Sequence, residues 1–356
     1  MRIKAYAKIN LCLVVLGKDT AAKSARANFS SAGNSYTATG RVKSGHEKNG
    51  GYHLIRTVLQ QIGLHDTITI KETDGQTIAI ACDNPMVPTG RRNSVYKAAE
   101  LMMRVAAGQK AASAGRKKTA LNKPGLHINI QKRIPVASGL GGASSDAAAV
   151  INALNIMWKL KLSSTKLRAL AAKIGMDTPF FITGGTALGT HYGEKITPLA
   201  PIKLPPFLIA LNGKKKSTAE MYGLLNLKKV GKKNGPKGAA DFLKDYLIRS
   251  PGDLARGSGD IAANTGSSTN AARPGTQANA TVSGFFHNDF ETILAHRQMA
   301  STKQLFGILL RSGAVAVHIC GSGPAICSFY KNKADLEKAH MGLKGKVKFL
   351  WKSGRQ

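Results

Sequence analysis

Acidic residues are scarce in this chain. Its 356 residues include 19 Asp and Glu against 52 Lys and Arg, which gives a formal net charge of +33 and a pI near 10.2. Such an excess of positive charge attracts polyanions, whether nucleic acids, acidic lipid head groups or nucleotides. The charge alone therefore keeps a nucleic-acid-binding protein open, and it predicts weak, non-specific binding to polyanions.

Long apolar runs and paired cysteines are also missing. No run approaches the roughly 18 uncharged apolar residues that a membrane helix needs, and the opening MRIKAYAKIN lacks the layout of a signal or transit peptide. We therefore expect a cytoplasmic protein with no membrane partner. The four cysteines, Cys12, Cys82, Cys320 and Cys327, are scattered without a CxxC pair. That spacing argues against a disulfide framework or a zinc site and predicts buried, reduced thiols.

Three stretches with little apolar periodicity are interpreted as insertions in a folded framework. They cover residues 18–49, 108–123 and 228–283 and are rich in small polar and basic residues. Segments of this composition cannot bury enough apolar surface to order themselves. We expect solvated loops that carry much of the positive charge, with only 241–249 suggesting a helix inside the last one.

The rest of the sequence predicts a mixed α/β framework. Residues 67–72 and 126–132 have the alternating, β-branched pattern of strands, and 317–330 is typical of a strand, a tight glycine turn and a second strand. We predict two domains, residues 1–198 and 204–356, with the functional site in the cleft between them.

Two helices are predicted from apolar residues at three-to-four spacing. One covers residues 94–106 and would be opened by Asn93 or Ser94. The other covers residues 163–174 and would be ended by Gly175.

The most informative stretch is PVASGLGGASSDAAAVINALNIMW, residues 135–158. It predicts the end of a strand, a glycine-rich turn and a buried helix that begins near Ser144 or Ser145. The N-terminus of a helix exposes unpaired N–H groups and partial positive charge, so it binds phosphate. The glycines of the turn let the backbone approach the anion without a Cβ in the way.

Two better-known glycine loops do not match this stretch. A Walker loop ends in Gly-Lys-Ser or Gly-Lys-Thr, whereas Gly142 is followed by Ala-Ser-Ser. The dinucleotide fingerprint needs GxGxxG, which is also absent. Taken alone, the loop also permits a simpler interpretation, a tight turn capped by a serine.

The loop resembles the phosphate-binding signature of the GHMP kinase superfamily in Pro135, Gly139-Leu140 and Ser144-Ser145-Asp146-Ala147-Ala148. Within that superfamily the chain is most similar to the kinases of 4-diphosphocytidyl-2-C-methylerythritol, which act in the non-mevalonate isoprenoid route. Further motifs occur in the order of that family: Ala7-Lys8-Ile9-Asn10-Leu11, Gly51-Tyr52-His53 with Leu54 and Thr57, Gly175 to Phe181, Gly189 with Gly193-Glu194, Ser217-Thr218-Ala219 with Tyr222, Asn288 to Glu291, and Gly321 to Pro324.

The resemblance implies an enzyme that transfers the terminal phosphoryl group of ATP, with Mg²⁺, to the 2-hydroxyl of that substrate. It implies Lys8 and Asp177 as the catalytic residues and leaves the metal ligands and the oligomeric state unknown. Phosphoryl transfer needs positioning, charge stabilisation and one base for the hydroxyl. A lysine beside an aspartate would keep the carboxylate ionised. Met176 stands where the family usually has alanine.

The resemblance also implies the binding residues. ATP would be bound by Pro135, Val136, Ala137, Ser138, Gly139, Leu140, Gly141, Gly142, Ala143, Ser144 and Ser145 of the loop, and by Asn93 and Lys132 outside it. The substrate would be bound by Asn10, Tyr52, His53, Thr218 and Tyr222. The aromatic rings would stack on the cytosine, and hydrogen bonds to its edge would select it.

Two alternatives remain. One is another kinase of the superfamily that acts on mevalonate, homoserine or a sugar; Tyr52 and Tyr222 argue against it, because those substrates carry no base. The other is a nucleic-acid-binding protein on a retired kinase fold, which the intact Lys8 and Asp177 oppose. By the same resemblance, Asn288-Asp289 is expected to be structural and the turn at Gly321 to close the far side of the site.

Overall fold

The computed structural model describes residues 1–19, 52–113, 124–213, 217–228, 230 and 286–354. Most of the predicted insertions, the suggested helix at 241–249 and the polyanion contacts expected of them lie outside these residues. Two insertion boundaries are corrected, because 18–19 belong to a strand and 108–113 to a helix.

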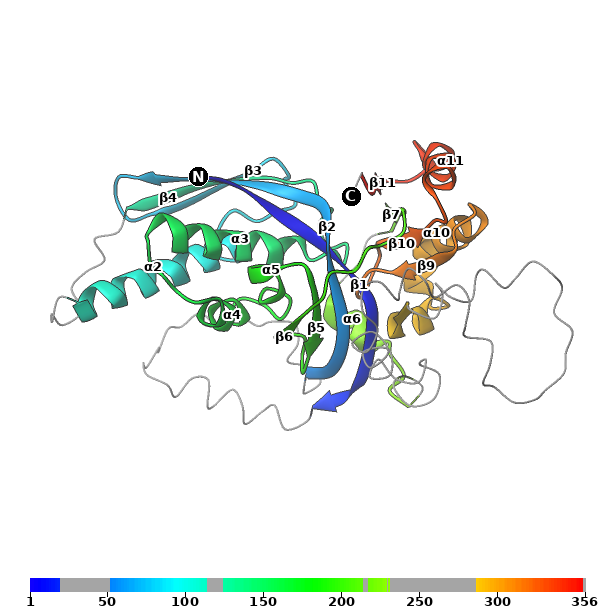
Figure 1. Ribbon diagram of the computed structural model, residues 1–356, viewed down its shortest axis with the longest axis horizontal. Helices are drawn as coiled ribbons and strands as arrows, with labels where there is room; N and C mark the ends of the chain where they lie inside the picture. Colours follow the sequence, from blue (N-terminus) through cyan, green and yellow to red (C-terminus); the bar gives the residue numbers. More distant parts are fainter. Residues whose placement is uncertain (20–51, 114–123, 214–216, 229, 231–285, 355–356) are drawn as a thin grey trace, which may run out of the picture.

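Seven strands form the larger sheet: β1 (Arg2–Asp19), β2 (Tyr52–Thr73), β3 (Ile78–Cys82), β4 (Gly125–Gln131), β5 (Thr186–Thr190), β6 (Lys195–Leu199) and β8 (His287–Asn288). Their order is β3-β4-β2-β1-β8, and β5 pairs with both β2 and β6. The antiparallel β1 and β2 are the long strands that cross the molecule in Figure 1. The predicted strands 67–72 and 126–132 are parts of β2 and β4.

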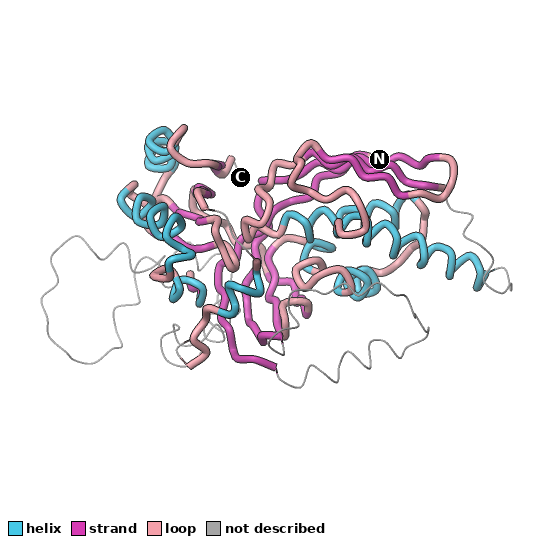
Figure 2. Tube along the Cα trace, turned by 180° about the vertical axis from the view of Figure 1, so that it is seen from behind, coloured by secondary structure: helices cyan, strands magenta, loops and turns pink. Residues whose placement is uncertain are grey.

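Four helices cover one face of this sheet: α2 (Ser94–Ser113), α3 (Gly142–Met157), α4 (Ser164–Ala172) and α5 (Phe180–Thr183). Figures 1 and 2 show them together below the sheet. Ile70 of β2 and Ile128 of β4 are fully buried against Met102 of α2 and Ile151 of α3. The helical repeat of apolar residues seen in the sequence therefore forms this core.

A second, antiparallel sheet of order β11-β7-β10-β9 packs against the other face: β7 (Phe207–Leu211), β9 (Ala316–Ile319), β10 (Ile326–Phe329) and β11 (Phe349–Lys352). Strand β7 is apolar throughout because both of its faces are buried. Phe207 and Ile209 face the larger sheet, while Leu208 and Ala210 face α10 (Ala300–Arg311) and α11 (Lys333–Leu343). Two sheets thus lie between two layers of helices.

The helix boundaries confirm some predictions and correct others. Helix α2 starts at Ser94, where the Asn93 side chain accepts the Val95 N–H at 2.8 Å, but it continues to Ser113. Helix α4 ends at Ala172, three residues before Gly175, so that glycine does not end it.

The N-terminus of α3 lies two residues earlier than the first serine proposed for it. The helix begins at Gly142 because Gly141, with a φ of 76°, already turns the chain into it. A left-handed φ of this kind suits a residue without a Cβ. Neither predicted serine therefore caps this helix, and a backbone turn sets its start.

Three of the four cysteines are buried as predicted, but Cys82 is partly exposed. In the part of the chain that the structure describes, no helix is both long and apolar enough to cross a bilayer. The predicted division of the chain into domains 1–198 and 204–356 stays a prediction. Strand β8, from the second half of the chain, pairs with β1 of the first half.

Candidate active site

Lys8 reaches the site because β1 is irregular. The pairing of β1 with β2 slips between Tyr6 and Lys8, and such a bulge exchanges the faces to which the following side chains point. Ala5 packs toward the helices, whereas Ile9 packs toward the second sheet. Lys8 and Asn10 consequently point to the helix side, where the glycine loop lies. The Lys8 N–H also donates to the Leu140 carbonyl at 3.0 Å, which joins the strand to that loop.

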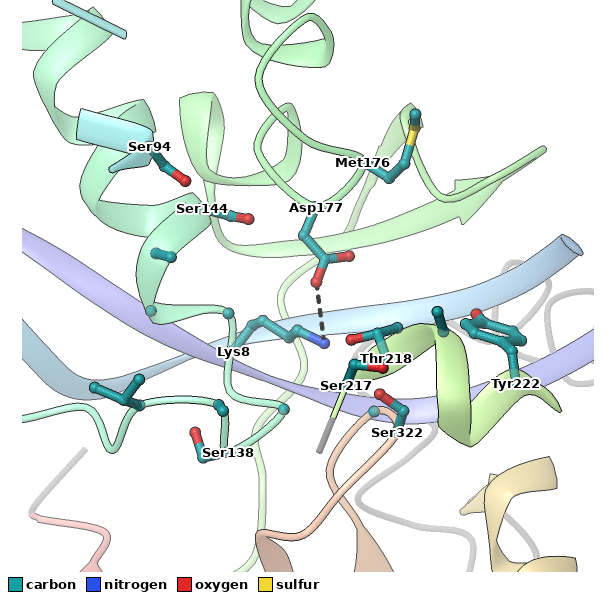
Figure 3. A pocket seen from close by; sticks show the side chains of 18 of the residues that line it. Lys8, Ser94, Ser138, Ser144, Met176, Asp177, Ser217, Thr218, Tyr222 and Ser322 are labelled. Atoms are coloured by element: carbon teal, nitrogen blue, oxygen red, sulfur yellow. Dashed lines mark ion pairs between the residues drawn. The ribbon is translucent and has the colours of Figure 1, made fainter. Parts of the chain in front are cut away.

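Asp177 approaches Lys8 from the turn between α4 and α5. Its Oδ2 lies 3.6 Å from the Lys8 Nζ; the lysine side chain is 4% exposed and the aspartate side chain 42%. Figure 3 shows this pair in the middle of the cavity, with Ser144 on one side and Thr218 and Tyr222 on the other. A buried ammonium next to an open carboxylate is suited to orienting a hydroxyl and receiving the charge of a phosphoryl group.

The glycine loop is closed on one side by the turn between β9 and β10. Gly139 has a φ of 92°, and a Cβ at this position would lie 2.1 Å from the Cys320 carbonyl oxygen. Ala325 N–H donates to the Ser138 carbonyl at 3.0 Å. The loop and the Gly321 turn are therefore built against each other. Gly321 and Ser322 line the same cavity, as the sequence predicted for that turn.

Lys132 is held by carboxylates below the loop. Its Nζ contacts Asp66 and lies 2.9 Å from Asp146 Oδ2, with all three side chains at most 5% exposed. Burial raises the pKa of Asp146 to about 7, against the attraction of Lys132. A Cβ on Gly142 would lie 3.2 Å from the lysine Nζ. Lys132 thus supports the start of α3 from beneath. No pattern in the sequence indicated that Asp66 and Asp146 would be its partners.

The aromatic residues gather at the other end of the cavity. His53 stacks on Tyr222 with ring centroids 4.6 Å apart and 21° between the planes, and Tyr222 meets the edge of Phe290. Burial, and after it the charge of Lys18, lowers the pKa of His53, which favours a neutral ring that can both donate and accept. Since the two rings already touch, a flat ligand bound here would have to stack on an outer face of this pair.

One cavity of about 940 Å³ collects nearly all the predicted site residues. Both predicted catalytic residues and all five predicted substrate residues line it, as do Asn93, Lys132 and most of the glycine loop. Leu140 and Ser145 do not. Leu140 is fully buried, and the Ser145 hydroxyl donates to the Tyr6 carbonyl at 2.6 Å. These two side chains lie behind the loop, away from the cavity, and their binding of ATP stays a prediction.

Tyr192 is a lining residue that the sequence reasoning missed. It lies in the turn between β5 and β6, where its hydroxyl donates to Asp19 at 2.6 Å and its ring lies 4.9 Å from that of Tyr52. The pKa of the Tyr192 hydroxyl is raised to about 12, chiefly by this hydrogen bond to Asp19. The sequence contained one signal for it, because Tyr192 lies between Gly189 and Glu194, which both match motifs of the family.

Asn288 and Asp289 hold the backbone, in line with the structural role expected of them. The Asn288 amide donates to the carbonyls of Ile319 and Gly321, both at 2.7 Å. Asp289 Oδ2 accepts the Val15 N–H at 2.6 Å. These bonds fasten the Gly321 turn and β1 to one another, and the two side chains do not line the cavity.

Four layers of helices and sheets, with a glycine loop at the N-terminus of a largely buried helix, define a class of kinase. Residues 93–185 match the model of the GHMP kinases N terminal domain. A solved 4-(cytidine 5'-diphospho)-2C-methyl-D-erythritol kinase shares the fold at a TM-score of 0.65, with 24% identity and both chains fully covered. A mevalonate kinase of Methanococcus jannaschii aligns at a TM-score of 0.57 with 15% identity, over 99% of this chain and 97% of that one.

Sequence relatives narrow the class. The 4-diphosphocytidyl-2-C-methyl-D-erythritol kinase of Alkaliphilus metalliredigens is 30% identical and covers 96% of this chain and 92% of its own. That of Caldicellulosiruptor saccharolyticus is 31% identical over 98% and 94%. The chain belongs to the 4-diphosphocytidyl-2-C-methyl-D-erythritol kinase family of GHMP kinases.

Proposed function

We propose that this protein transfers the terminal phosphoryl group of ATP to the 2-hydroxyl of 4-diphosphocytidyl-2-C-methyl-D-erythritol. The observation that carries the proposal is the ion pair of Lys8 and Asp177 at 3.6 Å, in one cavity with the glycine loop and a cluster of aromatic side chains. The loop would hold the phosphates of ATP, and the aromatic end would take the cytosine. The acceptor hydroxyl would then lie beside Asp177.

In this arrangement the two catalytic groups have separate roles. Asp177, partly open to the cavity, would orient the hydroxyl and accept its proton. Lys8 would stabilise charge on the migrating phosphoryl group. The ammonium keeps its place because the Asn10 Oδ1 accepts from it at 2.7 Å.

Mg²⁺ would enter with ATP. The described residues contain no group of three His, Cys, Asp or Glu that could hold a metal by themselves. Magnesium in kinases is bound by phosphate oxygens and only one or two carboxylates, so a ready-made cluster is not required. Asp146 Oδ1 has no hydrogen-bond partner in the described structure, and Asp146 lines the cavity together with Ser94 and Ser144. These oxygen donors suit the ion, which would neutralise the charge of the transferred phosphate.

The test of the function is a comparison of acceptors. The protein is given ATP and Mg²⁺ with 4-diphosphocytidyl-2-C-methyl-D-erythritol, mevalonate or homoserine in parallel, and ADP release is measured. We expect ADP with the cytidine compound alone. Turnover of mevalonate or homoserine instead would replace the proposed substrate, and no turnover with any of the three would refute the kinase proposal.

The aromatic end of the cavity should determine the affinity for the substrate and have little effect on the affinity for ATP. Replacing Tyr52 or Tyr222 with alanine is expected to weaken substrate binding by about 1–3 kcal/mol, the usual worth of one ring stacked on a base. The KM for ATP should change little. Steady-state kinetics with each ligand varied in turn measures both values. Equal losses for both ligands would mean that the tyrosines support the fold. The matched control is Tyr6→Ala, because the Tyr6 ring lies outside the cavity.

A further inference from the structure

A continuous chain of buried hydrogen bonds begins at the catalytic lysine. Lys8 Nζ donates to Asn10 Oδ1 at 2.7 Å, Asn10 Nδ2 donates to Thr57 Oγ1 at 2.8 Å, and Thr57 Oγ1 donates to the Cys12 carbonyl at 2.7 Å. The three side-chain residues are 3%, 7% and 2% exposed. Water therefore has little access to replace any of these partners.

The two ends of this chain fix the direction of every bond in it. An ammonium group can only donate and a backbone carbonyl can only accept. The single hydroxyl proton of Thr57 goes to the Cys12 carbonyl, so this oxygen is left to accept from Asn10. The Asn10 amide then has one allowed orientation, with its NH₂ toward Thr57 and its oxygen toward Lys8.

Thr57 stands where it can do this because of a second irregularity in β1. The pairing with β2 slips again between Asn10 and Cys12, so that Asn10 lies opposite Leu59 while Leu13 lies opposite Thr57. The slip brings the Thr57 hydroxyl between the Asn10 amide and the Cys12 carbonyl. Without that hydroxyl the Asn10 NH₂ would lose its acceptor, and the contact with the ammonium alone would hold the orientation of the amide.

We propose that Thr57 is a positioning residue for phosphoryl transfer. By fixing the Asn10 amide, it keeps the oxygen of that amide against Lys8 and so holds the ammonium in reach of Asp177. The inference rests on the proposed kinase function but does not depend on which acceptor the kinase uses. Thr57 also lines the cavity, so a direct contact with substrate is the competing explanation, and it predicts a different kinetic result.

The test compares Thr57→Val with Thr57→Ser, using whichever acceptor the wild-type protein phosphorylates. Valine keeps the shape but removes the hydroxyl, and we expect kcat to fall about 10-fold, the scale of one buried hydrogen bond that loses its partner, with both KM values within about 2-fold. Serine keeps the hydroxyl and should restore kcat. A rise in the acceptor KM with normal kcat would instead establish a direct substrate contact and overturn the proposal.

A double-mutant cycle separates positioning from general support of the fold. If Thr57 acts through Lys8, Thr57→Val should not lower kcat any further in a Lys8→Ala background. An equal loss in both backgrounds would overturn the proposal.

Thr186→Val is the matched control, a change at another buried threonine of the same sheet that is bonded to Gln60 Oε1 at 2.6 Å but lies outside the cavity. It should lower the melting temperature without lowering kcat. A Thr57→Val protein that melts far below this control and is inactive for that reason would also count against the proposal. Absence of wild-type turnover would instead refute the proposed function, so the two failures are distinguishable.

Discussion

Asp177→Asn is expected to lower kcat about 10²-fold or more, the scale of a lost general base. Asparagine has the size of aspartate but cannot accept the proton of the acceptor hydroxyl, and it leaves Lys8 without its counter-charge 3.6 Å away. The side chain is 42% exposed, so the fold should tolerate the change. ATP should still bind, because the glycine loop is untouched. Single-turnover ADP formation and ATP titration measure the two effects separately.

Lys8→Ala should act in the same direction, and the double variant should lose less than the sum of the two losses, since the two groups act as a unit. Asp74→Asn, at an exposed aspartate outside the cavity, is the control for removing one negative charge from this basic chain. Near-normal turnover in Asp177→Asn would remove the carboxylate from the chemistry.

The sequence predicted the fold class, and nearly all the residues that it placed in the site line the cavity, because short motifs carry both. Helical and alternating apolar patterns located strands within β2 and β4 and the starts of α2 and α4. The glycine-rich loop followed by a buried helix indicated a phosphate site through the physics of helix N-termini. These signals are local, so a single sequence contains them.

What the sequence could not give depends on register and on distant partners. Whether Lys8 faces the helices or the second sheet is decided by the irregular pairing with β2 between Tyr6 and Lys8, and no periodicity in β1 reveals it. Binding of ATP by Lys132 stays a prediction, but its contacts with Asp66, 66 residues away along the chain, and with Asp146 could not be foreseen. The close stack of His53 on Tyr222 likewise joins residues far apart in sequence.

Gly139→Ala should have the other large effect. The position has a φ of 92°, and its Cβ would lie 2.1 Å from the Cys320 carbonyl oxygen and 3.2 Å from that of Gly323. Both neighbours are backbone atoms of the turn that closes the loop, so they cannot rotate away as a side chain would. The loop or the turn has to move, and the next residue, Leu140, is the one whose carbonyl receives the Lys8 N–H. We expect the Kd for ATP to rise roughly 10²-fold, which corresponds to overpacking of about 1–3 kcal/mol together with the strain of a left-handed alanine.

Gly185→Ala separates these two contributions. Gly185 has a similar φ of 73°, but no atom lies within 4 Å of the Cβ it would gain, so the variant carries the backbone strain without the collision. It should lose about 1–2 kcal/mol of stability and bind ATP normally. Calorimetric titration with ATP and thermal melts of both variants measure the difference. If Gly139→Ala bound ATP as tightly as Gly185→Ala, the contact between the loop and the Cys320 turn would not shape the phosphate site. The glycine would then be needed only for its backbone conformation.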